Sequence, residues 1–280
     1  MGFASSPIFA DLGLEITGAS LDEIDGALLR AAIARAGVVR LRGFAVDQAA
    51  FVALSARISS RAIAHSLGAV RHRLREDGTV VAPLPGNAFV DLHGEMYFFP
   101  RHPDLVWFWC ERPPERGGAT TVADGAAFLR ALSPEARDEL DRRRLQFSVH
   151  MSADGVMSLG ETTDLERAMA NVRAMPGVIG LERRAGGYAL EYTTVAIVGD
   201  VFINSIMNVR RQGTTIRVRF ADGGEIEPTM IAELAEVGER LTRDLEWQTG
   251  DIVVMDNAQV IHGRRAFDGD RAIQIRHTML

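Results

Sequence analysis

Residues 89–99 read FVDLHGEMYFF, an apolar run that carries a histidine and a glutamate two positions apart. In a β-strand, residues i and i+2 point to the same face of the sheet and lie about 6.6 Å apart. If the run is a strand, His93 and Glu95 can together hold one metal ion. The run therefore predicts a strand and two ligands of a metal site, which needs at least one more ligand from elsewhere in the chain.

The segments around this run predict a mainly β fold with helical insertions. Apolar stretches bounded by glycine, proline or aspartate are typical of strands. Such stretches are TVVAPL (79–84), LVWFWC (105–110), YALEYTT (188–194), VFINSIMNV (201–209), TTIRVRF (214–220), DIVVMDNAQVIH (251–262) and RAIQIRH (271–277). Helical spacing and capping residues predict helices at 20–36, starting with a capping box of Ser20 and Glu23, and at 47–58, 133–143 and 228–245.

The order of these elements favours one domain that spans residues 1–280. Helices interrupt strands that are mostly non-consecutive, and the sequence contains no internal repeat or linker. This pattern predicts a double-stranded β-helix, or jelly-roll, core. Residues 151–180 show neither sustained alternation nor one clean helix, so we expect them to form an insertion that acts as a lid.

Composition and charge exclude several classes of function. The formal net charge of −6 and the lack of a long basic run argue against a nucleic-acid partner. All 31 basic residues are arginine, which excludes Schiff-base enzymes and phosphate-loop NTPases because both need a lysine amine. The single cysteine, Cys110, and the lack of a secretory signal or an apolar stretch of about 18 residues predict a cytoplasmic protein that does not enter a membrane.

A third metal ligand is predicted near the C-terminus. The segment TGDIVVMDNAQVIHGR (249–264) runs from a Gly-Asp turn through an apolar strand to His262. Two histidines and one carboxylate form the facial triad that binds iron(II) and leaves open positions for other ligands. The segment HPD (102–104) repeats the spacing of His93 and Glu95, but its central proline indicates a turn. For His262, the alternative role is a hydrogen bond in the core.

An arginine and a threonine are candidates for binding a dicarboxylate cosubstrate. Arg276 lies on RAIQIRH, a predicted strand that can fold back beside the strand of His262. Its guanidinium has the fork geometry that matches a carboxylate, so we expect it to hold the far end of the cosubstrate. Thr120, in ERGGATTVADG, can add a hydroxyl donor. Other arginines close by in the sequence are alternatives for the anchor: Arg264, Arg265 and Arg271.

Together these segments resemble the taurine dioxygenase and clavaminate synthase-like superfamily of iron(II)/2-oxoglutarate-dependent oxygenases. The resemblance covers nearly the whole chain. It is carried by LGLEITGASL with GVVRLRGF, by LHGEMYFFPRHPDLVWFWCERPPERGGATTVADG, by VFINSIMN and by WQTGDIVVMDNAQVIHGR. It implies that His93, Glu95 and His262 are the iron ligands, and that Thr120 and Arg276 hold the distal carboxylate of 2-oxoglutarate.

The same resemblance implies a reaction. Members of the superfamily use iron(II), 2-oxoglutarate and dioxygen to oxidise an unactivated C–H bond of a small molecule, normally by hydroxylation. Taurine dioxygenase has aspartate at the position of Glu95, whereas clavaminate synthase-like members have glutamate, which shifts the expected substrate toward amino-acid-derived compounds of specialised-metabolite biosynthesis. Halogenases replace this carboxylate with a small residue, so Glu95 argues against halogenation.

The sequence leaves two other interpretations open. A cupin-like metalloenzyme that does not use 2-oxoglutarate is expected to carry an H-x-H pair on one strand, and this chain has none. A non-catalytic jelly-roll binding protein is expected to need no metal with open coordination positions. Binding of 2-oxoglutarate together with iron(II) separates both from an oxygenase.

Overall fold

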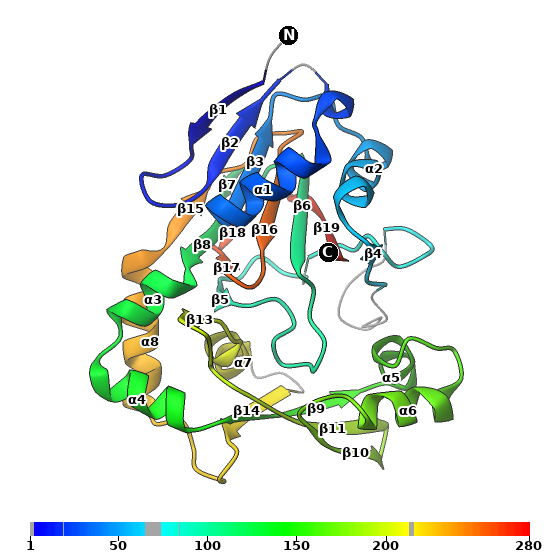
Figure 1. Ribbon diagram of the computed structural model, residues 1–280, viewed down its shortest axis with the longest axis vertical. Helices are drawn as coiled ribbons and strands as arrows, with labels where there is room; N and C mark the ends of the chain where they lie inside the picture. Colours follow the sequence, from blue (N-terminus) through cyan, green and yellow to red (C-terminus); the bar gives the residue numbers. More distant parts are fainter. Residues whose placement is uncertain (1–2, 19, 65–73, 84, 213–215) are drawn as a thin grey trace.

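Two β-sheets form the upper and middle parts of the molecule in Figure 1, and a third sheet lies below them. The structure is a computed structural model that describes residues 3–18, 20–64, 74–83, 85–212 and 216–280. The first two sheets carry the residues of the candidate site. The third sheet carries the segment that was predicted to be a lid.

The first sheet has seven strands within the described ranges, and all neighbours in it are antiparallel except β2 and β3. In spatial order the strands are β1 (Ala4–Pro7), β2 (Leu14–Thr17), β3 (Val38–Arg42), β16 (Ile252–Asp256), β6 (Leu105–Arg112), β19 (Ala272–Met279) and β4 (Arg61–Ala62). Trp107, Trp109 and Val254 pack with apolar residues of helices α1 (Gly26–Ala36) and α2 (Gln48–Ile58). Because side chains alternate along a strand, Phe108 and Val253 point to the other face.

The second sheet packs against that other face. In spatial order its strands are β15 (Arg243–Leu245), β8 (Thr120–Asp124), β17 (Val260–Arg264) and β5 (Val90–His93). The two sheets share one hydrophobic cluster, to which Phe108 contributes from the first sheet and Val122 from the second. Such a pair of facing antiparallel sheets forms a jelly-roll core, and the predicted fold class is confirmed.

The third sheet contains, in spatial order, β10 (Val178–Arg184), β11 (Gly187–Thr194), β9 (Leu145–Met151) and β14 (Ile216–Phe220). A separate hydrophobic cluster joins it to the surrounding helices, which are α3 (Gly125–Ala131), α4 (Pro134–Arg142), α5 (Ala153–Leu159), α6 (Leu165–Arg173), α7 (Ile206–Gln212) and α8 (Pro228–Leu241). Two short ribbons complete the fold, β7 (Arg116–Gly117) with β18 (Phe267–Asp268) and β12 (Ile197–Val198) with β13 (Val201–Phe202).

The predicted insertion at 151–180 contains helices α5 and α6 and the start of β10. Figure 1 shows both helices beside the third sheet, at the lower right of the molecule. That this segment closes over a substrate stays a prediction, and so does the assignment of residues 1–280 to one domain.

The first long helix begins later than its sequence predicts. Ser20 caps only a 3₁₀ turn, η1 (Leu21–Glu23), in which its hydroxyl accepts from the backbone N–H of Asp22. The helix itself begins at Gly26, because the carboxylate of Asp25 accepts the N–H groups of the first turn. Its end at Gly37 is as predicted, with a positive φ of 68° that suits glycine.

Four predicted strands are also shorter than expected. Strand β5 ends at His93 and a turn follows, residues 201–209 form β13 and then the start of α7, and residues 251–262 split between two sheets. Residues 79–83 form one isolated bridge, between Val81 and Ile275, and Leu84 lies outside the described residues. Asn204 explains the helix at 206, because its side-chain oxygen accepts the N–H of Ile206.

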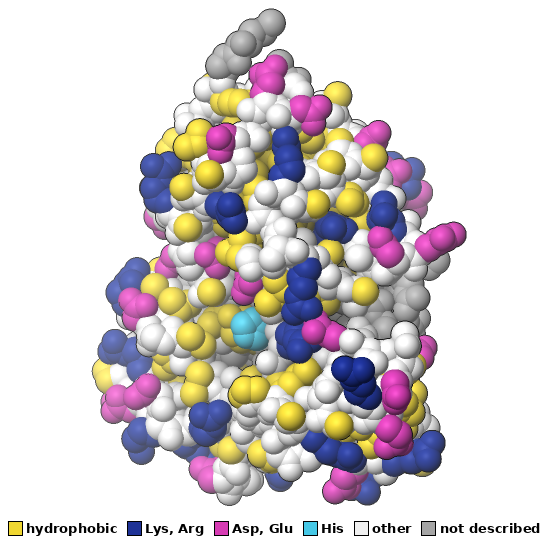
Figure 2. All heavy atoms as spheres, turned by 45° about the vertical axis from the view of Figure 1, so that its right-hand side comes forward, with side chains coloured by type: hydrophobic (Ala, Val, Ile, Leu, Met, Phe, Trp, Pro, Cys, Tyr) yellow, Lys and Arg dark blue, Asp and Glu magenta, His cyan; other side chains and the backbone are white. Residues whose placement is uncertain are grey.

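Charge is mixed over the surface. On the face in Figure 2, arginine and acidic side chains are interspersed. That nucleic acid is not a partner stays a prediction. No helix in the described part of the chain is both long enough and apolar enough to cross a bilayer. The cytoplasmic location stays a prediction.

Candidate active site

Two strands of the second sheet bring two histidines together. His93, the last residue of β5, lies directly opposite His262 of β17. Side chains of such a pair point to the same face of the sheet, and the two ring centroids are 4.5 Å apart. Glu95 joins them, with its Oε2 3.4 Å from His262 Nε2 and 3.7 Å from His93 Nε2. Among the described residues, these three form the one group of possible metal ligands whose donor atoms all lie within 4.8 Å of one another.

The donor chemistry of this group fits iron(II). His93 Nδ1 lies 2.8 Å from the carbonyl oxygen of Asp91, which can only accept, so Nδ1 carries the proton. The lone pair of that ring is therefore on Nε2, the atom that faces Glu95. A metal-binding histidine is commonly held by such a second hydrogen bond. Two imidazoles and a carboxylate, all buried, match the ligand set of non-haem iron(II) oxygenases.

Glu95 reaches the histidines from a turn and not from a strand. Met96, the next residue, has a positive φ of 64°, which is a strained backbone conformation for a residue other than glycine. Gly94 is needed before the turn, because a Cβ there would lie 2.5 Å from the Tyr97 ring. The expectation that His93 and Glu95 share one face of a strand is therefore wrong, although their side chains do meet.

Asn257 holds this turn, and the sequence analysis missed it. Its Oδ1 accepts the backbone N–H of Glu95 at 2.8 Å, and its Nδ2 donates to the backbone carbonyl oxygens of Glu95 at 3.1 Å and Pro103 at 2.8 Å. The side chain is almost fully buried. The only sign of this role in the sequence is that a polar residue directly follows the apolar strand β16. An asparagine at such a position is just as common in an ordinary turn.

The second oxygen of the Glu95 carboxylate faces another histidine. Oε1 lies 3.6 Å from Nε2 of His277, which is fully buried on β19. His277 does not belong to the group of three possible metal ligands. This neighbour was also missed, because its position depends on how β19 pairs with β6.

The three residues share a cavity, which is open to solvent, with a pair of arginines and a threonine. The remaining lining is largely apolar. The lining residues beyond His93, Glu95 and His262 are Pro83, Val90, Phe108, Thr120, Gly263, Arg264, Arg271 and Ile275. Gly263 is required for the close approach of β17 to β5, because a Cβ there would lie 2.4 Å from the carbonyl oxygen of Val90.

Arg271 and Thr120 lie together at the other end of this cavity. Arg271 Nη2 donates to Thr120 Oγ1 at 3.5 Å, and its Nε has no hydrogen-bond partner in the described structure. Burial, with a smaller contribution from Arg264, lowers the pKa of the Arg271 guanidinium to about 10, so it stays charged at neutral pH. A buried guanidinium with unused donors is suited to an anion.

The structure separates Arg276 from Thr120. Ile275 lines the cavity and His277 faces Glu95, so Arg276 between them points to the opposite face of β19. There its Nη1 donates to Thr79 Oγ1 at 2.7 Å. The expectation that the strand of Arg276 lies beside that of His262 is wrong, since β19 pairs with β6 and β4 in the other sheet.

Arg264, an alternative anchor from the sequence, also lines the cavity, whereas Arg265 and His102 do not. Arg265 pairs with Asp244 and Glu239. His102 stacks on the ring of Tyr97, with centroids 4.0 Å apart, and does not belong to the ligand group.

The fold and the site define a class of protein, and comparison with known proteins gives its family. Residues 4–279 match the family model described as taurine catabolism dioxygenase TauD, TfdA family. The chain belongs to this family of iron(II)- and 2-oxoglutarate-dependent dioxygenases. The predicted superfamily, enzyme class and cofactors are therefore confirmed at the level of the family.

Individual relatives are distant. A clavaminate synthase-like protein of Arabidopsis thaliana is 23% identical over 221 residues, which cover 68% of this chain and 64% of that protein. The dapdiamide synthesis protein DdaC of Enterobacter agglomerans is 18% identical over 266 residues, covering 85% and 81%. The match to the structure of PvcB from Pseudomonas aeruginosa covers 99% of this chain and 91% of the PvcB chain, with a TM-score of 0.61 and 16% identity. PvcB is described as an Fe, alpha-ketoglutarate dependent oxygenase from an isonitrile synthetic pathway.

Proposed function

We propose that this protein is an oxygenase in which His93, Glu95 and His262 hold iron(II), and that it hydroxylates a C–H bond of a small, amino-acid-like molecule. One observation carries the proposal. The three donor atoms lie within 4.8 Å of one another and line the same cavity as a buried arginine and threonine.

The residues at the ligand end prepare a metal site that is open on one side. His93 and His262 come from adjacent strands and Glu95 from the turn, so all three approach from the protein side. As a facial triad, these three residues would hold iron(II) and would leave it able to take further ligands. Bound iron(II) would supply the activation of dioxygen, for which side chains are not suited.

For the distal carboxylate of 2-oxoglutarate we assign Thr120 with Arg271 in place of Arg276. Arg271 supplies a charged donor that has no carboxylate partner among the described residues, and Thr120 supplies a hydroxyl 3.5 Å from it. Both line the cavity that holds the three ligands, whereas Arg276 lies on the far face of β19. Arginine and hydroxyl donors together suit a carboxylate.

The apolar residues of the cavity orient the bound cosubstrate. Phe108 and Ile275 line the cavity, and the Phe108 ring meets His262 edge-on with centroids 5.5 Å apart. An apolar wall leaves a bound 2-oxo acid few polar partners except at its two ends, which fixes its direction. It also lowers the local dielectric, which strengthens the carboxylate–guanidinium contact.

The substrate class rests on the names of similar proteins. They include a dapdiamide synthesis protein, an oxygenase of an isonitrile pathway and a clavaminate synthase-like protein. These support a small molecule of specialised-metabolite biosynthesis as the substrate.

We retain residues 151–180 as the proposed lid. A second cavity lies between this segment and the turn that contains Glu95, and it is lined by Met96 and Phe99 from the turn and by Met151 and Leu159 from the segment. Glu161 pairs with Arg101, 2.6 Å away, across the same gap. A substrate bound there would contact Met96, the residue that follows Glu95 in the chain.

The test is whether 2-oxoglutarate is consumed. The purified protein is supplied with iron(II), 2-oxoglutarate and dioxygen, and succinate is measured with and without a panel of amino-acid-derived compounds. We expect slow succinate formation that one compound class accelerates. Oxidation of a substrate without 2-oxoglutarate would favour a cupin-like enzyme, and no binding of iron(II) or 2-oxoglutarate would favour a binding protein.

A further inference from the structure

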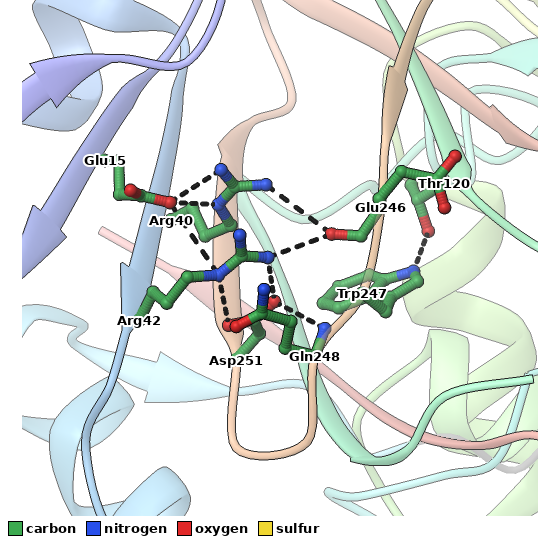
Figure 3. Close-up of polar contacts among 8 residues, drawn as sticks. All are labelled: Glu15, Arg40, Arg42, Thr120, Glu246, Trp247, Gln248 and Asp251. Carbon is green, nitrogen blue, oxygen red and sulfur yellow. Dashed lines mark hydrogen bonds and ion pairs between the residues drawn. The ribbon is translucent and has the colours of Figure 1, made fainter.

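Trp247 contacts the proposed anchor from outside the cavity. It follows β15 in the loop that leads to β16, and its indole Nε1 donates to Thr120 Oγ1 at 3.1 Å (Figure 3). Both side chains are buried. The indole is not among the residues that line the cavity, so it reaches a bound cosubstrate only through Thr120.

The two neighbours of the Thr120 hydroxyl leave it able to act only as a hydrogen-bond donor toward a third group. A threonine hydroxyl has one proton to donate and two lone pairs to accept with. Trp247 Nε1 and Arg271 Nη2 both carry protons and cannot accept, so each uses a lone pair of Oγ1. The hydroxyl proton is then available for a third group, and no acceptor in the described structure takes it.

We propose that Trp247 is a positioning residue for the cosubstrate, because it turns the Thr120 hydroxyl into a donor aimed at the distal carboxylate of 2-oxoglutarate. The inference rests on the proposed function. It adds that the anchor consists of three residues, of which one does not touch the ligand.

The loop around Trp247 is held firmly enough for this role. Asp251 accepts two hydrogen bonds from Arg42, at 2.6 and 2.9 Å, and also the backbone N–H of Gln248 at 2.8 Å. Arg42 in turn donates to the backbone carbonyl oxygen of Glu246 at 3.0 Å. Figure 3 shows these contacts on both sides of Trp247, at residues 246 and 248. The carboxylate of Asp251 is almost fully buried, so this ion pair is poorly screened by solvent.

The first test replaces the indole without removing the ring. In the manganese(II)-loaded protein, Trp247→Phe is expected to weaken 2-oxoglutarate binding about tenfold, the size of one hydrogen bond to a charged group, as measured by calorimetry. Binding of 2-oxopentanoate, which ends in a methyl group where 2-oxoglutarate has its distal carboxylate, should not change. Equal weakening of both ligands would overturn the inference, because the indole would then act by packing.

A matched control is Trp107→Phe. Trp107 Nε1 also donates to a threonine hydroxyl, that of Thr278 at 2.9 Å, but on the far face of the first sheet. The substitution removes the same type of hydrogen bond away from the cavity. We expect parental affinity for 2-oxoglutarate, and a loss as large as that of Trp247→Phe would contradict a local role for Trp247.

A double-mutant cycle with Thr120→Val gives the decisive result. If Trp247 acts only through the hydroxyl, Trp247→Phe has no further effect on 2-oxoglutarate affinity once the hydroxyl is gone. Additive losses would overturn the inference. A parent protein that does not bind 2-oxoglutarate would instead overturn the proposed function, and the inference with it.

Discussion

The two ends of the cavity are built in different ways. At the ligand end, His93, Glu95 and His262 meet within 4.8 Å, and backbone contacts such as that of His93 Nδ1 with Asp91 orient them. At the anchor end, Arg271 and Thr120 are 3.5 Å apart and depend on side chains from other parts of the chain. Metal binding should therefore survive damage to the anchor end, whereas cosubstrate binding should need both.

The largest expected effect is at the ligand end. His262→Ala removes one of three ligands, so we expect loss of measurable iron(II) or manganese(II) binding and of succinate formation, with the fold retained. Calorimetry measures metal binding, and circular dichroism measures whether the fold is retained. His102→Ala is the matched control, because His102 stacks on Tyr97 outside the ligand group. Loss of metal binding in the control alone would refute the ligand assignment.

The next effect separates the two ends. Arg271→Gln removes the charge that faces the cavity, so 2-oxoglutarate affinity should fall about 100-fold, while manganese(II) affinity stays at the parental value. Arg276→Gln, the same change at an arginine that does not line the cavity, should keep 2-oxoglutarate affinity within about twofold of the parent. The reverse order of the two variants would restore Arg276 as the anchor.

A smaller effect tests how Glu95 is held. Asn257→Ala removes three hydrogen bonds to backbone groups near Glu95, so metal affinity should fall by a factor of about 10 to 100. Asn171→Ala is the control for metal binding, since Asn171 makes one comparable contact, to the carbonyl oxygen of Gly160, which is not bonded to any of the three ligands. If both variants bind manganese(II) like the parent, the turn does not need Asn257.

The smallest effect concerns the second oxygen of Glu95. His277→Leu removes the imidazole 3.6 Å from Oε1, so manganese(II) affinity should fall about tenfold, and His277→Gln should restore part of it by offering a donor again. Titration of each variant with manganese(II) measures this. Equal affinities in the leucine variant and the parent would limit His277 to packing.

The ligand end could be predicted from the sequence because residue type and spacing define it. A histidine and a glutamate two positions apart and a distant histidine were enough, although the expected strand geometry was wrong for Glu95. The reason is the turn after His93, in which Met96 adopts a positive φ that its sequence does not signal.

The anchor end could not be predicted to the same depth. Arg271 and Arg276 have the same side chain, and which one faces the cavity depends on the course of β19, which begins directly after Arg271 and pairs with β6. A shift of one residue in such pairing moves every side chain to the other face. Trp247, Asn257 and His277 act through contacts between distant segments, so nothing in their local sequence marks them.

Local side-chain contacts also changed two of the predicted elements of the fold. The apolar stretch 201–209 is typical of a strand, yet it turns into α7 where Asn204 accepts the N–H of Ile206. At the first helix, the predicted cap Ser20 caps only a 3₁₀ turn, and Asp25, five residues later, caps the helix itself.

The most direct test of the central claim is a crystal structure of the protein with manganese(II) and 2-oxoglutarate bound. We expect the metal at bonding distance from His93 Nε2, Glu95 Oε2 and His262 Nε2, and the distal carboxylate of 2-oxoglutarate between Arg271 and Thr120. A metal bound without His262, or a distal carboxylate that contacts neither Arg271 nor Thr120, would contradict the account.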